Sequence, residues 1–178
     1  MRTNKFIYIL LIIFPFIFLA PLTFQYLEVG NDFELYYFVY KKYIFELLIS
    51  GHLPLWSPSE GAGYSLIFNP LTQYIYLPSW ILYLVSFFIG DLSKYSFLIY
   101  TISAISIFNV GLFLYLRTFN INFKIALTTV LITSLSLKIT ELLRFPNALH
   151  TFAWFPWILY GINSVLLNTN YKKNFVII

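Results

Sequence analysis

The sequence predicts an all-α, polytopic membrane protein in which a long polar loop follows the first helix. Of the 178 residues, 60% are hydrophobic and only 10% are charged, and the mean hydropathy is +0.77. Apolar runs close to the ~20 residues needed to cross a bilayer recur along the chain. Between the first two runs lies a segment that concentrates acids, glycines and prolines. A soluble domain of this length has no interior large enough to bury so much apolar surface.

The basic residues lie mostly in short segments between the apolar runs, where the positive-inside bias places them. The formal charge of +4 would favour nucleic acid as a partner only in a soluble protein, so we exclude nucleic acid. The chain contains no cysteine, which excludes disulfides and thiolate metal sites.

The first apolar run predicts a helix over 6–27, preceded by Arg2 and Lys5. A cleaved signal peptide is the alternative, but no small-x-small cleavage site follows the run. We therefore expect a retained helix whose N-terminus is cytoplasmic.

The loop over 28–73 is expected outside the cytoplasm. Within it, Phe33 to Ile49 has the spacing of an amphipathic helix lying in the membrane interface. The predicted apolar face comprises Leu35, Phe38, Tyr43, Ile44, Leu47 and Leu48, and it leaves Lys41 and Lys42 elsewhere. Ser50-Gly51 is expected to end this helix, and the prolines and glycines that follow make regular structure improbable.

The run over 74–90 decides the topology, because it is short for a span and contains Pro78. If it crosses, Arg117 and Lys124 fall outside the cell. If it is a juxtamembrane or re-entrant helix, they fall inside with the N-terminus. The distribution of basic residues over short loops favours the second arrangement.

Further spans are predicted over 95–116, 125–139 and 150–167. A last apolar run begins at 175–178, and four residues do not make a span. We therefore expect 1–178 to be one truncated transmembrane domain of a longer protein.

Asp32 is the first candidate for chemistry, because it places a carboxylate just after the first helix. A partly desolvated carboxylate there is suited to act as a general base or to help hold a divalent metal ion. The alternative is helix capping by Asn31 or Asp32, with Glu34 in a capping-box position.

A second group of candidates lies in the glycine-rich part of the loop. Gly61 and Gly63 let backbone N–H groups approach an anion, His52 is an adaptable donor, and Trp56 is suited to stack on a sugar or an isoprenoid. Glu60 lies beside them. The alternative is a turn-rich loop that Trp56 anchors in the lipid head groups.

The third group is Lys138, Glu141, Arg144 and His150. The planar fork of Arg144 suits a phosphate, although an i,i+3 pair with Glu141 at a helix end explains it equally well. The sequence contains no Ser-His-Asp order, no His-rich metal spacing and no P-loop.

These elements together resemble the first extracytoplasmic loop of the bacterial YfhO-like membrane proteins. The resemblance rests on Asp32, the stretch from Leu47 to Trp56, Gly61 to Tyr64, Asn69-Pro70, Tyr76-x-Pro78, and a second block from Ala148 to Ile162. Ser57 and Ser65 depart from the residues common in the family, and family members are far longer.

That family is similar to the GT-C glycosyltransferases, polytopic enzymes that take a sugar from a polyprenyl-phosphate carrier. The resemblance implies a GT-C-like fold with juxtamembrane helices in the first loop, in the bacterial cytoplasmic membrane. It also implies that Asp32 deprotonates an acceptor of the cell envelope, while Glu34, Tyr64, Arg144, His150 and the glycine-rich group bind substrate. The alternative is a non-catalytic polytopic protein, such as a lipid or glycan transporter or an assembly scaffold.

Overall fold

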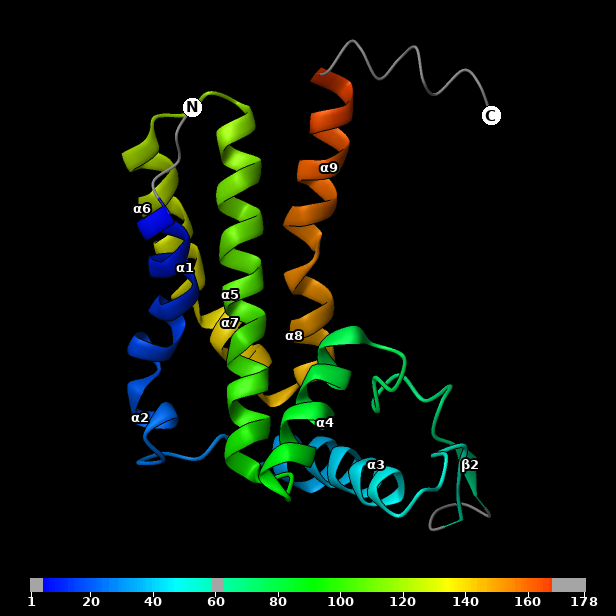
Figure 1. Ribbon diagram of the computed structural model, residues 1–178. Helices are drawn as coiled ribbons and strands as arrows, with labels where there is room; N and C mark the ends of the chain where they lie inside the picture. The colour runs from blue at the N-terminus through cyan, green and yellow to red at the C-terminus, as the bar shows by residue number, and fades with distance from the viewer. Residues whose placement is uncertain (1–4, 59–62, 168–178) are drawn as a thin grey trace, which may run out of the picture.

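The computed structural model describes residues 5–58 and 63–167, which form a mostly helical bundle (Figure 1). The elements that run along the bundle are α1 (Lys5–Phe18), α2 (Ala20–Thr23), α4 (Leu77–Ile89), α5 (Lys94–Thr118), α6 (Phe123–Ser134), α7 (Leu137–Glu141), the 3₁₀ turn η2 (Leu142–Arg144), α8 (Pro146–Ala153) and α9 (Phe155–Leu167). A π-helical segment η1 (Phe33–Phe38) continues into α3 (Val39–Ile49), and together they lie across one end of the bundle.

Helix α5 is the central element, and the other long helices pack around it. Helix α1 runs antiparallel to it (Figure 1). The Ser106 hydroxyl of α5 donates to the Ile12 carbonyl of α1 over 2.7 Å. Helix α9 runs parallel to it, and Trp157 Nε1 donates to the Ile107 carbonyl over 2.8 Å. The indole of Trp157 also lies against Gly111, where a Cβ atom would be 2.5 Å from Cδ1. A glycine at this point of α5 therefore allows the close approach of α9.

The helix expected over 6–27 is shorter in the structure. Helix α1 ends at Phe18, α2 ends at Thr23, and the chain from Phe24 to Asn31 is not helical. Pro21 cannot donate a backbone hydrogen bond, so the helix is interrupted near it. Gln25 and Asn31 then adopt positive φ angles of 62° and 49°, which no continuing α-helix permits.

The helices expected over 125–139 and 150–167 also have different limits. Helix α6 ends at Ser134, and α7 with η2 follows at an angle of 42° after the break. The side chain of Ser136 caps α7, which is a local reason for the break. Helix α8 begins four residues earlier than expected, because Pro146 occupies its first position. The expected run at 175–178 lies outside the described residues.

A helix does cover Phe33 to Ile49, but its buried face differs from the predicted one. Phe33, Tyr37, Ile44 and Phe45 are buried, whereas Leu35 is 70% exposed. Lys41, expected outside this face, is 1% exposed and lies in the middle of it. The π-helical segment takes more residues per turn than an α-helix and so changes which residues share a face.

After this helix ends at Ser50 and Gly51, the chain forms a short antiparallel hairpin that the sequence did not predict. Strand β1 (Trp56–Ser57) pairs with β2 (Tyr64–Ser65), with Trp56 opposite Ser65. Gly63 has a φ of 100° and supports the Trp56 ring, where any Cβ atom would be 2.4 Å from the indole nitrogen.

Helix α4 and the start of α5 form a helical hairpin, joined by Gly90 to Ser93. Gly90 ends α4 in the left-handed conformation, and the Ser93 side chain caps α5 by accepting from the Ser96 backbone N–H. Thirteen residues of α4 rise only about 20 Å. Helix α4 therefore covers only the half of α5 nearer to Lys94 (Figure 1).

The two ends of the bundle differ in charge. The end at which α1 begins, α5 ends and α6 begins carries Lys5, Arg117 and Lys124 (Figure 1). The acidic residues that the structure describes lie toward the opposite end, on or beside η1, α3, α4 and α7: Glu28, Asp32, Glu34, Glu46, Asp91 and Glu141. The same elements, η2 and the start of α5 also carry basic residues: Lys41, Lys42, Lys94, Lys138 and Arg144.

Within the described ranges, α5 is the one helix that is both long and apolar enough to cross a membrane. Helices α6 and α7 with η2 would make a second span if the bent pair is counted as one. Because 67% of the apolar window of α5 is buried, the core helix of a soluble protein would meet the same criterion. The fold is therefore mostly helical with one candidate span.

Candidate functional site

A cluster of buried polar side chains lies where α3, the start of α4, α5 and α8 meet. The Lys41 amine donates to Ser79 Oγ over 2.6 Å, and Ser79 Oγ is 3.1 Å from the Tyr100 hydroxyl. The Tyr100 hydroxyl in turn donates to Gln73 Oε1 over 2.9 Å. The chain of hydrogen bonds thus runs from an amine to a neutral amide and reaches no carboxylate.

Lys41 is the central cation of this cluster. Its Nζ lies 5.5 Å from the ring centre of Tyr83 and 5.4 Å from that of Tyr100, so two aromatic faces enclose it. None of the ion pairs between described residues includes it. Burial holds the pKa of Lys41 well below its usual range, because an ammonium ion in this apolar setting loses its hydration.

His150 forms the side of the cluster contributed by α8. Its ring stacks on Tyr100 with centroids 4.1 Å apart, and its Nδ1 is 3.1 Å from the Tyr76 hydroxyl. That hydroxyl also accepts from Trp154 Nε1 over 2.6 Å. His150 was predicted to bind substrate at the membrane surface, but its side chain is fully buried.

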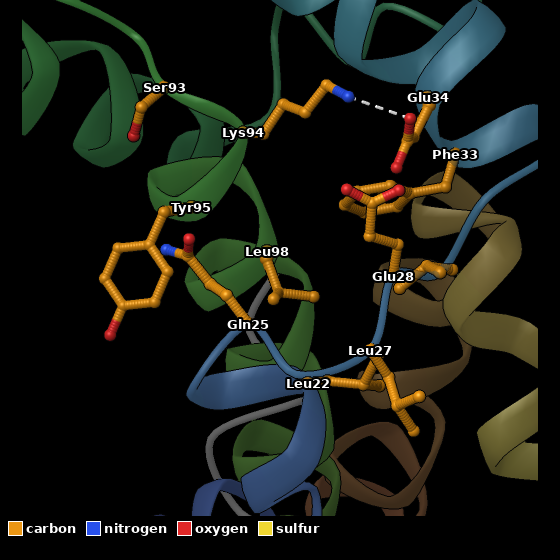
Figure 2. Close-up of a pocket in the computed structure, with 11 residues that line it drawn as sticks. Leu22, Gln25, Leu27, Glu28, Phe33, Glu34, Ser93, Lys94, Tyr95 and Leu98 are labelled. Atoms are coloured by element: carbon orange, nitrogen blue, oxygen red, sulfur yellow. Dashed lines mark hydrogen bonds and ion pairs between the residues drawn. The ribbon is translucent and has the colours of Figure 1, made fainter.

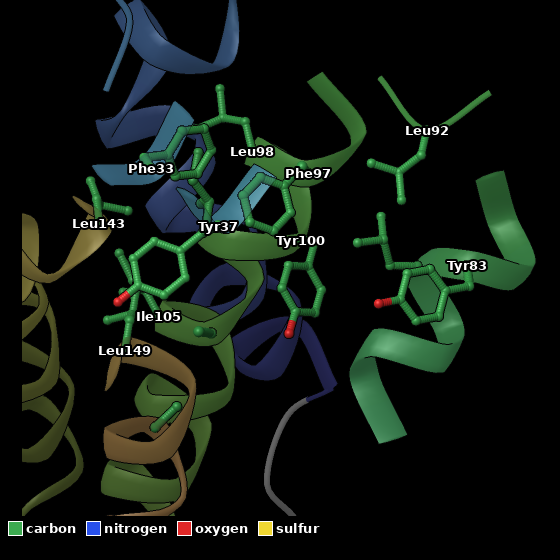
Figure 3. Packing of buried hydrophobic residues seen from close by; sticks show 14 of the residues in the cluster. Phe33, Tyr37, Tyr83, Leu92, Phe97, Leu98, Tyr100, Ile105, Leu143 and Leu149 are labelled. Carbon is green, nitrogen blue, oxygen red and sulfur yellow. The ribbon is translucent and has the colours of Figure 1, made fainter. Parts of the chain in front are cut away.

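The buried cluster retains polar atoms that have no hydrogen-bond partner among the described residues. These are the Tyr83 hydroxyl, Ser86 Oγ and His150 Nε2. Figure 3 shows the Tyr83 hydroxyl directed toward the side on which Tyr100 lies. Unpaired buried polar groups are uncommon and destabilising, so the Tyr83 hydroxyl and His150 Nε2 are groups that a ligand could satisfy.

Asp32 lies elsewhere, directly before the transverse helix that η1 and α3 form together (Phe33–Ile49). It precedes η1 in a helical conformation, and its side chain makes no capping hydrogen bond, so the capping alternative fails for this residue. Burial raises the pKa of the Tyr37 hydroxyl, and the nearby Asp32 carboxylate acts in the same direction. Tyr37 packs edge-on against Phe145, with ring centres 6.4 Å apart. Asp32 is thus near the corner between η2 and α8.

Arg144 lies at that same corner. Its guanidinium is 3.8 Å from the Glu141 carboxylate and lies over the Phe145 ring. The i,i+3 pairing that the sequence offered as an alternative is therefore present. The side chain remains partly exposed, so pairing with Glu141 leaves donors of its fork free to face another oxyanion.

A separate cavity of about 340 Å³ lies between the end of α2, η1 and the start of α5 (Figure 2). Glu28 and Glu34 extend toward it, and Lys94 donates to Glu34 over 2.8 Å. Leu22 and Phe33 contribute apolar walls. Asp32 does not line this cavity, so Glu34, and not Asp32, is the predicted site residue found in it.

The glycine-rich group lies at the other end of α3 from Asp32. His52 is exposed and is 3.2 Å from the Ser50 hydroxyl, and Trp56 is 57% exposed. Tyr64 packs edge-on against Tyr40 of α3. Glu60 and Gly61 lie outside the described residues. The expected cavity shared by Asp32 and this excursion is therefore not formed by the residues that the structure describes.

The expectation that Asp32 helps to hold a divalent metal ion has no support in the donor set. Among the described residues no three His, Cys, Asp or Glu side chains gather in a way suited to a metal. We accordingly derive no chemistry through a metal ion.

The principal residue missed by sequence reasoning is Lys41. It lies four residues after Tyr37 and three before Ile44, which are both buried, and this spacing was the available signal. Lysines are expected on the solvent-exposed face of a helix, and Lys41 was therefore not predicted to be buried. Comparison of the chain with protein-family models, with curated proteins and with solved structures finds no match.

Proposed function

We propose that this chain is part of a bacterial cytoplasmic membrane protein and acts in sugar transfer as a GT-C-type glycosyltransferase. The membrane assignment is supported by large apolar side chains that remain exposed along the bundle. They include Phe6, Ile9, Ile13 and Ile17 on α1, Leu84, Phe87 and Phe88 on α4, and Ile158, Ile162 and Leu166 on α9. Exposure of these apolar faces to water is unfavourable, and lipid chains around the bundle would cover them.

The proposed orientation places the end that carries Lys5, Arg117 and Lys124 in the cytoplasm. The opposite end also carries basic residues, but four of them, Lys42, Lys94, Lys138 and Arg144, lie within 4 Å of a carboxylate. The transverse helix and Asp32 then lie on the extracytoplasmic side. Helix α4, too short for the ~30 Å hydrocarbon layer, acts as a re-entrant segment that returns to that side.

The observation that carries the catalytic proposal is the position of Asp32 at the start of the transverse helix, on the same end as Arg144. In the proposed reaction the Asp32 carboxylate takes the proton of an acceptor hydroxyl. The acceptor oxygen attacks the anomeric carbon of the sugar, and the bond to the polyprenyl phosphate breaks, which inverts that carbon. Arg144 stabilises the phosphate that leaves.

The test is to exchange Asp32 in the full-length protein. Asp32→Asn keeps the shape of the side chain but removes the base, so we expect transfer to fall about 10²–10⁴-fold. The measurement is mass spectrometry of envelope glycans in a deletion strain complemented with each variant, at matched levels of inserted protein. Asp91→Asn is the control, because Asp91 is an exposed partner of Lys42 at the same end. Full transfer by Asp32→Asn would refute the base assignment.

A non-catalytic transporter or scaffold is the second candidate, and one observation favours it. Asp32 does not line the cavity of Figure 2, whereas a base must reach its substrate. The same strain separates the two functions. Sugar transfer requires a missing glycan in the deletion strain, and a scaffold that binds lipid leaves each sugar in place.

A further inference from the structure

The cluster around Lys41 supplies hydrogen-bond donors and a buried amine, and no carboxylate of the described residues pairs with that amine. A bound anion would favour the protonated form of the amine. A lysine ammonium has three N–H donors, and one of them is used on Ser79. The two rings beside it attract a cation but accept no strong hydrogen bond. The Tyr83 hydroxyl adds an unused donor within the same region. An anion is the ligand that would satisfy all these groups together.

An apolar groove of about 480 Å³ reaches this cluster from the outer surface of the bundle. Its walls are aliphatic residues of α4 and α5, and Tyr100 belongs to both the groove and the hydrogen-bonded cluster. The groove extends from Tyr95 to Ile107 along α5, roughly 18 Å at the rise of an α-helix. Such a length and lining suit an extended hydrocarbon chain.

We propose that the Lys41 cluster binds the phosphate head group of an anionic membrane phospholipid, whose acyl chain lies in the groove between α4 and α5. A phosphate is favoured over a carboxylate because it offers more oxygens to the two unused N–H donors of Lys41 and to the Tyr83 hydroxyl. A lipid is favoured over a free phosphate because the groove that leads to the cluster is apolar.

This site is separate from the proposed catalytic position. Eight residues, Phe33 to Tyr40, lie between Asp32 and Lys41, which places the two residues roughly 13 Å apart along the helix axis. Lipid binding therefore does not rest on sugar transfer. The Asp32→Asn variant is expected to bind lipid as the unchanged protein does, so failure of either proposal leaves the other standing.

The experiment uses the full-length protein in neutral detergent and measures binding of fluorescent phosphatidic acid. Phosphatidylcholine and inorganic phosphate are the comparison probes. We expect phosphatidic acid to bind, and Lys41→Met to weaken it at least tenfold. Lys42→Met is the matched control, because Lys42 is the adjacent lysine and pairs with Asp91 at the surface over 3.7 Å. Its affinity should stay within twofold of the unchanged protein.

The melting temperature provides a second readout, which Lys41→Met should not lower although it weakens lipid binding. Removing an unpaired buried charge should leave the melting temperature of Lys41→Met unchanged or raise it, in the absence of lipid. Tyr83→Phe removes only the unpaired hydroxyl and keeps the ring, so it should fold and yet bind phosphatidic acid several-fold more weakly.

Unchanged binding by both variants, or no binding by the unchanged protein, would overturn the proposal. Lys41-dependent binding of inorganic phosphate that equals phosphatidic acid would overturn the lipid assignment. Binding of phosphatidylcholine equal to that of phosphatidic acid would show that the site does not distinguish head groups by charge, and it would overturn the anionic-lipid assignment.

Discussion

The two halves of α5 are packed in different ways. Toward Thr118, rings and small residues fit closely: Trp157 lies on Gly111, and Tyr8 packs edge-on against Phe113 with centres 6.3 Å apart. Toward Lys94, the helix faces the Lys41 cluster, with its unpaired hydroxyls and uncompensated cation. Functional sites commonly retain groups that reduce stability. Most of the buried hydrophobic core also surrounds the half toward Lys94, including Phe97, Ile102 and Ile105. That half therefore supports the fold and also holds the polar cluster, whereas the half toward Thr118 contains close helix contacts around a smaller core.

The largest expected effect concerns which side of the membrane each end faces. The chain has no cysteine, so single cysteines at Ser50 and Asn120 can be labelled without background. An impermeant maleimide should label Ser50→Cys in intact cells and should label Asn120→Cys only after permeabilisation. Labelling of both positions from the same side would contradict the proposed orientation.

The next prediction tests the close packing in the half of α5 toward Thr118. Gly111→Ala places a Cβ atom against the Trp157 indole, so it should lower the free energy of unfolding by about 1–3 kcal/mol. Gly161→Ala is the control on α9, where a Cβ atom meets nothing within 4 Å. It should raise helix stability by up to ~1 kcal/mol. Detergent unfolding followed by circular dichroism measures both, and equal effects would show that Gly111 is not a contact point.

Two buried serines sharpen the comparison between the halves. Ser106 donates across the α1–α5 interface, so Ser106→Ala should destabilise the protein by about 1 kcal/mol. Ser86 has no partner among the described residues, so Ser86→Ala should leave stability unchanged or raise it. Thermal melts of the two variants under the same conditions show whether each substitution lowers or raises stability. Destabilisation by Ser86→Ala would mean that its hydroxyl is paired.

The smallest effect is expected from the exposed pair between Lys94 and Glu34. Lys94→Met should leave the free energy of unfolding almost unchanged, because water screens an exposed ion pair. Any loss should shrink as salt is added. Melts at low and high ionic strength provide the check, and a large loss that persists in salt would indicate that the pair supports the cavity of Figure 2.

Much of the helical layout could be predicted from the sequence, because apolar runs, prolines and cap residues act locally. The helix expected over 95–116 lies within α5, and the amphipathic helix from Phe33 to Ile49 is present, with Ser50 and Gly51 ending it. The interruption of the first helix could not be read from its hydropathy. It depends on how Pro21 and the residues after it leave the helical conformation.

The candidate site was predicted less well, since it depends on which faces meet. Asp32 and Arg144 lie on the same end, as expected, and the i,i+3 pair of Arg144 with Glu141 is present. His52 and Trp56 lie away from Asp32, and His150 is buried in a cluster that includes Lys41. The spacing of Lys41 from Tyr37 and Ile44 is a local sign that it shares their face, but it does not show what encloses the amine. Its environment is made by Ser79, Tyr83 and Tyr100, which are distant along the chain.

By itself the sequence determined a helical chain of mainly apolar residues, with its polar loop between the first two apolar runs. Only the tertiary structure decided that α4 returns halfway along α5 and that η1 and α3 lie across the end of the bundle. Composition and periodicity act over one or two turns of helix. The burial of a charge and the residues that enclose it depend on contacts between segments far apart in the chain, and packing alone settles those.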